Sequence, residues 1–399
     1  MKALRFERNM ARFAAARVAS AMVPGKGARV GPLSLVDTDP PALPNDQWQR
    51  IRPRLAGICG SDLSTIDATA SRYFEPIVSF PFVPGHEVVA DTDDDRRVVL
   101  EPVLGCLTRG IDPPCDPCGR GDLGNCERIG FGDLEPGLQS GFCCSTGGGW
   151  SSSMVAHASQ LHPVPEAFTD DDAVMVEPTA CAIHAALSSP VTEGDVVAVI
   201  GAGTLGLLTT AALRHFTAVG PLAIGARYGH QRQLARELGA DYVSDPPELA
   251  RLIRRLTGSM TLGAQLTGGA DVVFDCVGSS ASITEALQIV RPRGTVVLVG
   301  MPANVSLELT GLWHRETRLQ GAYAYGTETL PDGRRSRTFD LAFELVAAQK
   351  LGRLVSAHYR LRDYTRAVEH AAGAGRRGAV KIAFDLRDES SREHKERNR

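Results

Sequence analysis

Four cysteines crowd one short polar stretch of the sequence, at positions 106, 115, 118 and 126. Cys115 and Cys118 are separated by two residues, a spacing that lets both thiolates turn toward one metal ion. Four thiolates around zinc (Cys106, Cys115, Cys118 and Cys126) would form a closed tetrahedron, which stabilises a loop but leaves no coordination position for a reaction. The competing interpretation is reduced cysteines without a metal, although the prolines and glycines of this stretch leave it few other means of becoming ordered.

A disulfide framework is the other use to which clustered cysteines are put. The first residues carry arginines and many alanines, faintly like a transit peptide, but they lack the apolar centre of a secretory signal. We therefore expect a cytoplasmic protein in a reducing compartment, where the nine cysteines do not pair and metal binding is favoured.

A second set of possible zinc ligands is scattered along the chain. Cys59 lies in the segment GICGSD, His86 is followed by Glu87 in PFVPGHEVV, and Glu177 lies in VMVEPTACAIHA. A thiolate, an imidazole and a carboxylate are good zinc ligands, and three of them would leave a fourth position for water or a substrate oxygen, as a catalytic zinc requires. Taken singly, each residue also has an ordinary structural explanation, so the hypothesis depends on their joint occurrence.

A glycine turn offers a different chemistry. Gly201, Gly203 and Gly206 fit the pattern G-x-G-x-x-G within VVAVIGAGTLGLLTTAALRHF. In such a turn the first glycine makes a tight bend, the second lets the backbone approach a pyrophosphate, and the third lets helix and strand pack closely. The helix would direct the positive end of its dipole toward the phosphates, so the turn predicts a dinucleotide site.

Hydrophobic patterning predicts the elements that position this turn. Short apolar strands alternate with helical stretches after it, which favours a doubly wound parallel α/β sheet from about residue 187 to 326. The expected strands are PLAIGA, ADYVS, DVVFDCVG and GTVVLVGMP, and the expected helices include HQRQLAREL and SITEALQIV. A chain of 399 residues is too long for one ordinary core, so we expect two domains.

Composition excludes several classes of partner. With 43% hydrophobic and 22% charged residues the chain is expected to fold, and its formal charge of −3 gives no general attraction to nucleic acids or anionic membranes. The longest uncharged run, residues 196–213, is interrupted by three glycines and three threonines, so we interpret it as a buried strand, turn and helix. The final segment, RDESSREHKERNR, is predicted to be a solvated tail.

These motifs, in this order, resemble the zinc-dependent medium-chain alcohol dehydrogenases, particularly the branch of polyol, sugar and threonine dehydrogenases. The most specific elements are CGSD, GHE, the cysteine stretch, VEP and GAGTLG, and the resemblance covers nearly the whole chain. It implies a GroES-like, partly open β-barrel domain that carries the metal sites, formed by residues 1–186 and 327–399, and a Rossmann domain formed by residues 187–326.

The same resemblance implies roles for individual residues. Cys59, His86 and Glu177 would bind a catalytic zinc, with Glu87 beside the metal or as an alternative ligand. Ser61 would pass the substrate proton outward, and Asp62 would orient the zinc-bound histidine. Zinc would polarise a substrate hydroxyl while the nicotinamide accepts hydride, and the reverse reaction would reduce a carbonyl. Contacts to the dinucleotide are expected from Gly201, Gly203, Thr204, Leu205, Gly206, Arg227, Cys276, Val299, Gly300 and Lys381.

The sequence departs from the family pattern in several places. The family's cysteine stretch usually reads C-x2-C-x2-C-x7-C, which would put Asp112 at the first position; we prefer Cys106, because thiolate is the softer ligand, but Asp112 stays an alternative. Many relatives carry a histidine soon after CGSD that completes the proton relay, and here Ser64 or a water would replace it. Ala90 stands where glycine is common, and residues 11–27 have no counterpart in the family pattern.

Arg227 decides our expectation about the cofactor. An enzyme that uses NAD usually has an acidic residue at the end of the second Rossmann strand, and here Arg227 lies 21 positions after Gly206, with no carboxylate in residues 223–236. An arginine there can pair with a 2′-phosphate, assisted by His230 or Arg232, so NADP is favoured over NAD. Lys381 aligns loosely with a basic residue near the cofactor, and an ordinary lysine at a strand end explains it equally well.

The substrate is less well specified. A polyol, a sugar or a small secondary alcohol fits the carboxylate ligand, and Tyr73 and Phe74 are candidates for the pocket lining. Two other functions compete: a zinc-independent carbonyl or ene reductase of the same superfamily, and a non-catalytic dinucleotide-binding redox sensor, although either would be expected to lack some of these ligands. By analogy we expect a homodimer or homotetramer that pairs through a sheet edge, for which the segment VSLEL is a candidate.

Overall fold

The computed structural model describes residues 1–389, and these form two compact units. Unit 1 comprises Met1–Glu177 together with the chain from Lys350 onward, and unit 2 comprises Pro178–Gln349. We expected boundaries at 186/187 and 326/327, whereas unit 2 begins at Pro178 and ends at Gln349. Unit 2 therefore also contains most of helix α6 (Val176–Leu187), the hairpin of residues 327–337 and helix α12 (Thr338–Gln349). Helix α12 packs on helix α7 (Thr204–Phe216). The predicted solvated tail lies almost entirely outside the described residues.

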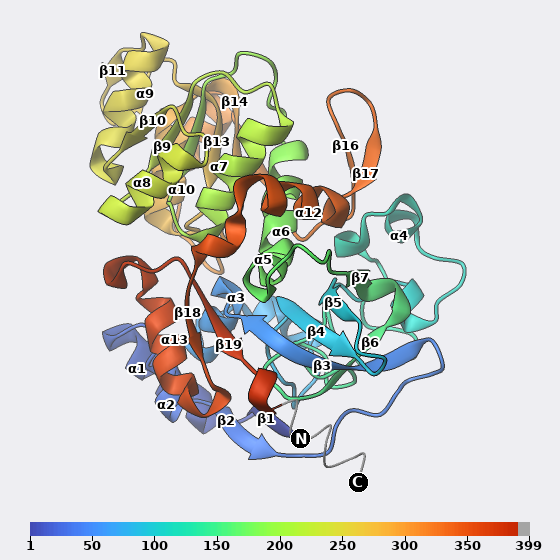
Figure 1. Ribbon diagram of the computed structural model, residues 1–399. Helices are drawn as coiled ribbons and strands as arrows, with labels where there is room; N and C mark the ends of the chain where they lie inside the picture. Colours follow the sequence, from blue (N-terminus) through green and yellow to red (C-terminus); the bar gives the residue numbers. More distant parts are fainter. Residues whose placement is uncertain (390–399) are drawn as a thin grey trace. The chain divides into compact units, whose positions relative to one another are not determined.

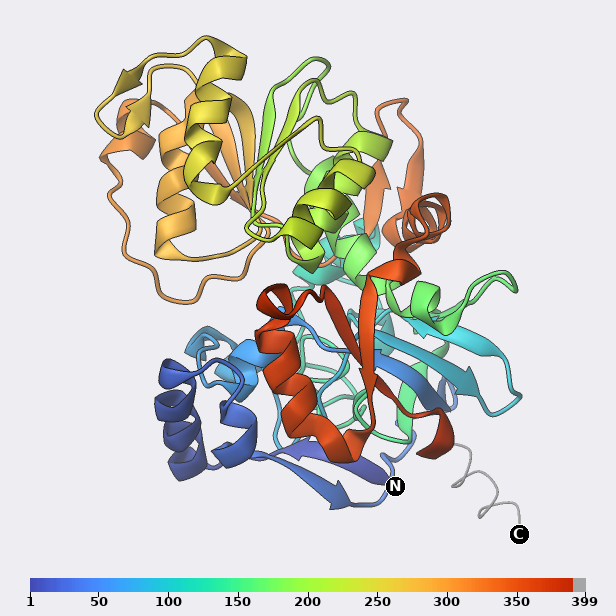
Figure 2. The same cartoon turned by 60° about the vertical axis from the view of Figure 1, so that its left-hand side comes forward.

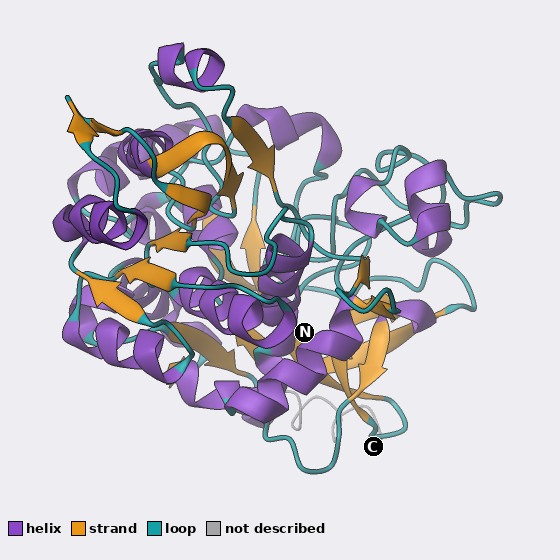
Figure 3. Cartoon of the chain, turned by 90° about the horizontal axis from the view of Figure 1, so that it is seen from above, coloured by secondary structure: helices purple, strands orange, loops and turns teal. Residues whose placement is uncertain are grey.

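Unit 2 contains a six-stranded parallel sheet in the order β10-β9-β8-β13-β14-β15, flanked by helices (Figures 1 and 3). Its strands are β8 (Val197–Ile200), β9 (Leu222–Gly225), β10 (Tyr242–Ser244), β13 (Ala270–Asp275), β14 (Val290–Leu298) and β15 (Arg318–Gly321). Its main helices are α6 (Val176–Leu187), α7 (Thr204–Phe216), α8 (Gly229–Glu237), α9 (Leu249–Thr257) and α10 (Ser280–Ile289). The order reverses between β8 and β13, which is the arrangement of a dinucleotide-binding sheet.

The doubly wound sheet predicted from the sequence is therefore confirmed. All residues of β8 and β9 are buried, as expected for parallel strands that are covered on both faces. The edge strands are β10 and β15, and the segment VSLEL, suggested as the edge that pairs subunits, forms no strand in this structure. Peripheral elements complete the unit: the hairpin β11 (Thr261–Leu262) and β12 (Gln265–Leu266), helix α11 (Thr310–His314), the hairpin β16 (Thr327–Thr329) and β17 (Arg335–Arg337), and helix α12 (Thr338–Gln349).

Unit 1 is built on a mainly antiparallel seven-stranded sheet in the order β18-β19-β3-β4-β5-β7, with β6 also paired to β3. Its strands are β3 (Trp48–Gly57), β4 (Val88–Thr92), β5 (Arg97–Leu100), β6 (Met154–His157), β7 (Leu161–Pro163), β18 (Val355–Tyr359) and β19 (Lys381–Asp385). The remaining elements are β1 (Lys2–Phe6), β2 (Leu33–Asp37), α1 (Met10–Met22), α2 (Gly27–Val30), α3 (Gly60–Ile66), α4 (Asp116–Arg120), α5 (Asp170–Val174) and α13 (Tyr364–Ala372).

Aromatic packing joins the ends of the chain in the core of unit 1. Trp150 is fully buried, meets the ring of Phe384 edge-on at 5.0 Å, and donates its indole N–H to the backbone oxygen of Gly57 at 3.1 Å. Phe6 stacks on Phe82 at 5.2 Å. Because Phe384 belongs to β19, the last strand packs into a core made mostly by N-terminal residues.

The segment without a family counterpart forms α1 and α2, which lie beside α13 in unit 1 (Figure 2). Asp67 attaches this segment to the end of α3: its carboxylate accepts the backbone N–H groups of Gly25 at 2.7 Å and Gly27 at 3.1 Å. A Cβ on Gly27 would lie 2.3 Å from the backbone oxygen of Ile66, so only glycine allows this approach. The insertion thus supports the helix that begins beside Cys59.

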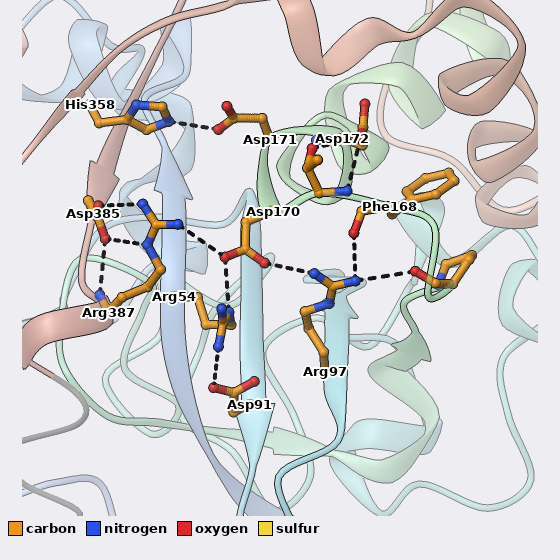
Figure 4. Close-up of polar contacts among 12 residues, drawn as sticks. Arg54, Asp91, Arg97, Phe168, Asp170, Asp171, Asp172, His358, Asp385 and Arg387 are labelled. Atoms are coloured by element: carbon orange, nitrogen blue, oxygen red, sulfur yellow. Dashed lines mark hydrogen bonds and ion pairs between the residues drawn. The ribbon is translucent and has the colours of Figure 1, made fainter.

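A second buried carboxylate fixes the start of α5. Asp170 is 7% exposed and forms ion pairs with Arg54 on β3, Arg97 on β5 and Arg387 after β19, at 3.0, 3.2 and 3.6 Å (Figure 4). The helix is also capped by reciprocal hydrogen bonds between Thr169 and Asp172. Since α6 begins two residues after α5 ends, these contacts position the first turn of α6, which carries Glu177.

Candidate active site and metal lobe

The cysteine lobe, defined here as residues 106–126, brings four sulfur atoms together. The Sγ atoms of Cys106, Cys115, Cys118 and Cys126 all lie within 4.8 Å of one another. Cys115 caps α4 and Cys118 lies within it, while Cys106 and Cys126 flank short 3₁₀ turns. Asp112 is exposed and lies outside this group, so the geometry assembles the set with Cys106. No disulfide occurs among the described residues, which include all nine cysteines.

Backbone N–H groups favour thiolates in the lobe. Cys115 donates its N–H to the Sγ of Cys106 at 3.3 Å, and Arg128 donates to the Sγ of Cys126 at 3.4 Å. Although burial alone would raise the pKa of Cys115, backbone N–H groups lower it to about 7. Burial raises the pKa of Cys126 to about 11 and that of Cys118 further still. Such crowded thiols cannot all ionise without a cation, and four sulfur donors suit zinc.

The second group, called the Cys59 group here, consists of Cys59, His86 and Glu87, whose ligand atoms lie within 4.8 Å of one another. Cys59 is the N-cap of α3, and its backbone N–H is held by the Asp62 carboxylate at 2.9 Å. His86 and Glu87 precede β4 and are 4% and 1% exposed. Gly85, at φ +98°, makes the turn before them, where a Cβ would collide with the Trp150 ring.

Glu177 is also buried, but it lies outside the Cys59 group. The distances therefore differ from the expected arrangement, in which Glu177 was the carboxylate ligand and Glu87 its alternative. The reason is local: Glu177 projects from the first turn of α6, whereas Glu87 follows His86 directly in the chain. The charge of Glu177 still reaches the site, because it raises the pKa of both His86 and Lys381.

The Cys59 group lies in a strongly anionic environment. Burial alone would lower the pKa of His86, but Asp62, Cys59 and Glu177 together raise it to about 10. Asp62 Oδ1 lies 3.7 Å from His86 Nδ1, and neither of these buried atoms has a hydrogen-bond partner. Burial also raises the pKa of Asp62. Thiolate, imidazole and carboxylate atoms that converge in a negative field without full hydrogen bonding are the donor set that fits a divalent zinc ion.

Lys381 belongs to this environment too. Its ammonium forms an ion pair with Glu87 and donates to the backbone oxygen of Ile58 at 3.2 Å. Burial would lower the pKa of Lys381, but Glu87 and then Cys59 raise it, so the lysine stays charged. A Cβ on Gly57 would lie 1.9 Å from a Glu87 oxygen, so glycine is required beside the pair. Lys381, expected as a neighbour of the dinucleotide, thus has its ammonium paired with Glu87.

Ser61 provides an unpaired hydroxyl next to Cys59. Its Oγ is buried and has no hydrogen-bond partner among the described residues. Ser64, expected as a possible continuation of the relay, donates its hydroxyl to the backbone oxygen of Ser61 at 3.0 Å, and Thr65 does the same at 2.8 Å. The Ser61 hydroxyl is thus free to bond to a ligand, while Ser64 is already engaged.

In unit 2, the glycine turn has the geometry expected of a phosphate cradle. Gly201 has φ +93°, and a Cβ on Gly206 would lie 1.9 Å from the Gly201 oxygen. A Cβ on Gly203 would meet no protein atom within 4 Å, so the protein's own packing does not require glycine there. As the N-cap of α7, Gly203 has no side chain to accept the N–H groups of Leu205 and Gly206. These features fit a pyrophosphate.

The other expected dinucleotide residues lie at the carboxyl ends of neighbouring strands. Cys276 follows β13 and is half-buried, and desolvation raises its pKa to about 12, so it serves as a small apolar group. Val299 and Gly300 follow β14 and donate their N–H groups to the Asp275 oxygen at 3.0 and 2.8 Å. Gly300 packs so closely on Gly278 that a Cβ would lie 2.5 Å from its nitrogen. Together they border the reversal in strand order beside the glycine turn.

Arg227 follows β9 and is exposed, and within residues 1–389 it forms no ion pair. Arg232 is engaged instead: it pairs with Asp245 and donates to the backbone oxygen of Arg227 at 2.9 Å. His230 stacks on Tyr228 with ring centres 6.0 Å apart. Of the two arginines, Arg227 is therefore the one with a guanidinium available to a ligand.

Two features of the site escaped sequence reasoning. The Lys381–Glu87 pair was hidden because the partners are remote in sequence, and only the occurrence of a lysine within the apolar strand GAVKIAF signalled it. The second is Arg109, a fully buried arginine beside the cysteine lobe, which carries no signal in the sequence beyond its place between Cys106 and Cys115.

Comparison with known families settles the class of this fold. Residues 45–166 match the profile described as alcohol dehydrogenase GroES-like domain, and residues 204–350 match the one described as zinc-binding dehydrogenase. The chain belongs to the zinc-binding alcohol dehydrogenase family. This confirms the resemblance, the two-domain fold class and the assignment as an enzyme.

Individual relatives agree with the membership. The sequence is 27% identical to D-xylulose reductase A from Aspergillus oryzae over 75% of this chain and 78% of that protein. It is 26% identical to L-idonate 5-dehydrogenase from Vitis vinifera over 84% of this chain and 87% of the relative. The crystal structure of 2R,3R-butanediol dehydrogenase from Bacillus subtilis has the same fold, with a TM-score of 0.67 at 21% identity over 96% of this chain and 99% of that one.

Proposed function

We propose that this dehydrogenase oxidises a secondary alcohol of a polyol or sugar, with hydride transfer to NADP, and reduces the corresponding ketone in reverse. The observation that carries the proposal is the Cys59 group, three zinc-type donors in a buried anionic site beside the unpaired Ser61 hydroxyl. The relatives named as acting on xylulose and idonate support a polyol or sugar as the substrate class.

Cys59 and His86 would hold the catalytic zinc, with Glu87 or Glu177 as the carboxylate. Bound there, zinc supplies a Lewis acid that lowers the pKa of a substrate hydroxyl. Asp62, whose Oδ1 lies 3.7 Å from His86 Nδ1, orients the His86 ring, and Lys381 compensates the charge of Glu87. Ser61, whose hydroxyl has no partner among the described residues, accepts the hydroxyl proton of the substrate and passes it toward solvent.

The dinucleotide would be held by unit 2. The glycine turn and the uncapped start of α7 bind its pyrophosphate through backbone N–H groups. Bound nicotinamide supplies the hydride acceptor. We propose NADP because Arg227 is exposed and unpaired at the end of β9, where it can form a charge-assisted contact with a 2′-phosphate, and Arg232 holds the loop in place through Asp245.

Location and assembly are also proposed. Among the described residues no helix is both long and apolar enough to cross a membrane. We propose a cytoplasmic enzyme, which agrees with nine cysteines that form no disulfide within residues 1–389. We further propose a homodimer or homotetramer that pairs along the edge strand β15, where Leu319 is exposed.

One experiment separates this function from its alternatives. Metal is counted in the purified enzyme, and oxidation and reduction are followed with a panel of polyols, sugars and ketones in the presence of each nicotinamide cofactor. Two zinc ions per chain, one for each ligand group, and turnover that a chelator abolishes are expected. Turnover that survives complete removal of metal would instead indicate a zinc-independent reductase, and cofactor binding without turnover of any substrate would indicate a redox sensor.

A further inference from the structure

Arg109 is the only arginine among the largest fully buried side chains of the described residues, with an exposed fraction of 0%. Its guanidinium donates hydrogen bonds only to backbone oxygens, and each of its three nitrogens has at least one such acceptor. The acceptors are Leu104 at 3.1 Å, Phe131 at 3.2 Å, Leu134 at 3.3 Å, Glu135 at 3.4 Å and Gly137.

These acceptors satisfy the N–H groups but do not neutralise the charge. A guanidinium cannot lose its proton in a protein, and an isolated charge in an apolar interior is strongly unfavourable unless an opposite charge lies nearby. Within residues 1–389 no carboxylate forms an ion pair with Arg109. The acidic residues of the segment that supplies its acceptors do not provide one: Asp133 is exposed and accepts from Asn45, and Glu135 offers only its backbone oxygen.

Arg109 lies next to the first cysteine of the lobe: its backbone N–H donates to the backbone oxygen of Cys106 at 3.0 Å. Burial lowers the pKa of the Arg109 guanidinium, while Cys143, Cys126 and Cys106 raise it. Cys143 donates its S–H to the Glu135 oxygen at 3.4 Å, and burial raises its pKa, so this thiol is neutral. Cys126 and Cys106 belong to the cysteine lobe. Any negative charge opposite Arg109 therefore comes from the lobe.

The place of Arg109 in the chain agrees with a role in the cysteine lobe. The spacing between the first two cysteines of the lobe is eight residues in this sequence, and Arg109 lies in that longer interval. Its hydrogen bonds join the segment that enters the lobe, at Leu104, to the segment that leaves it, at residues 131–137. The Arg109 side chain thus links the two segments that flank the cysteine lobe, close in sequence to its first ligand, Cys106.

We propose that Arg109 is the internal counter-ion of a zinc ion bound by the four cysteines. The inference rests on the proposed zinc occupancy of the lobe, and it does not depend on the substrate, the cofactor or the catalytic metal. Four thiolates around one divalent ion retain excess negative charge, and a buried guanidinium compensates part of it. Zinc binding displaces the thiol protons, so the excess negative charge that Arg109 would compensate exists only in the loaded lobe. Arg109 is a positioning residue, because it acts through the thiolates.

The test compares Arg109→Gln and Arg109→Lys with the wild type. Arg109→Gln keeps hydrogen-bond donors but removes the charge, and Arg109→Lys keeps the charge. Arg120→Gln is the matched control, since Arg120 lies in the same lobe with a side chain that is 63% exposed. Release of zinc into excess chromogenic chelator is timed for each protein. The phase that belongs to the lobe is identified as the one missing from a Cys118→Ser variant.

We expect Arg109→Gln to release the lobe zinc at least about tenfold faster, the scale found when a group that supports a metal ligand is removed. Arg109→Lys should release it within about threefold of the wild type, and Arg120→Gln at the wild-type rate. Wild-type release from Arg109→Gln, with the lobe loaded, would overturn this inference and leave the proposed function intact. A wild-type lobe that binds no metal would overturn both the inference and the proposed structural zinc.

A second measurement separates charge compensation from simple packing and covers variants that fold poorly. Urea unfolding is followed for zinc-loaded and zinc-stripped forms of the wild type, Arg109→Gln and Arg109→Lys. A counter-ion predicts that Arg109→Gln lowers the unfolding midpoint mainly in the loaded form, and that Arg109→Lys restores it. Equal losses in loaded and stripped forms would show that Arg109 serves the backbone alone and would overturn the proposal.

Discussion

The ammonium of Lys381 forms an ion pair with the carboxylate of Glu87 although the two side chains are only 3% and 1% exposed. Replacing one partner of a buried pair leaves the other charge without compensation, so we expect Lys381→Met to lower the free energy of unfolding by about 3–5 kcal/mol. Urea unfolding of the zinc-stripped protein measures this loss. The double variant with Glu87→Gln should recover much of it, and a double variant as unstable as Lys381→Met would contradict the pairing.

Ser61 is predicted to carry the proton of the substrate. Because its buried hydroxyl has no partner, Ser61→Ala should leave folding and zinc content unchanged while kcat falls by roughly 10²–10⁴-fold. Steady-state kinetics and a metal count test this. Ser64→Ala is the control, since Ser64 only caps the backbone oxygen of Ser61, and its kcat should stay close to the wild type. Equal losses in both variants would remove Ser61 from the mechanism.

Arg227 is predicted to select NADP. Loss of a charge-assisted contact costs about 1.5–3 kcal/mol, so Arg227→Ala should raise the KM for NADPH by roughly 10–100-fold and leave the KM for NADH nearly unchanged. Initial rates with both cofactors measure the ratio. Arg236, exposed in α8 with its guanidinium bonded to the Arg232 backbone oxygen, provides the control variant Arg236→Ala. Parallel changes for both cofactors would refute the assignment.

The α1–α2 insertion is predicted to be fixed by Asp67. Its carboxylate accepts two backbone N–H groups while buried, so Asp67→Ala should destabilise the protein by about 2–4 kcal/mol. Limited proteolysis should then cut within residues 10–30 before the rest of the chain. Asp37→Ala is the comparison, because Asp37 forms only an exposed pair with Lys2, and it should change stability little.

The His358–Asp171 pair gives a pH dependence (Figure 4). The hydrogen bond that His358 donates to the Asp171 carboxylate raises the pKa of His358, helped by the charges of Asp171 and Asp385, while burial and Arg387 act in the opposite direction. The folded pKa thus exceeds the unfolded one, so this stabilisation is complete below the unfolded pKa and disappears as pH rises through the folded pKa. The stability difference between the wild type and His358→Gln should therefore be larger at about pH 5.5 than at about pH 9. A difference independent of pH would contradict the assigned protonation.

The parallel sheet was predictable because its strands are continuous apolar runs. The glycine turn was predictable because its geometry depends only on residues that are neighbours in the sequence. The ligand groups were predictable as residue types, since thiolates and imidazoles in short motifs carry the chemistry. The placement of Glu87, rather than Glu177, beside Cys59 and His86 was not, because it depends on how the folded chain brings the carboxylates together.

The insertion at residues 10–30 was also beyond sequence reasoning. Its partner, Asp67, lies some forty residues away, and the contacts run between a carboxylate and backbone N–H groups, which leave no pattern in side-chain types. The same holds for Arg109, whose acceptors are all backbone oxygens. Periodicity reports which faces are apolar, but it does not report where a buried polar group finds its partner.

The last strand, β19, is inserted between β18 and β3, and so it lies in the interior of a sheet whose other members come mostly from the first half of the chain. On the ribosome, β3 and Glu87 therefore emerge long before the segment that completes their hydrogen bonding and neutralises their charge. Unit 2 is continuous in sequence and has all its strands before that segment appears. A nascent chain interrupted before residue 381 would retain a finished dinucleotide sheet and an unfinished metal domain.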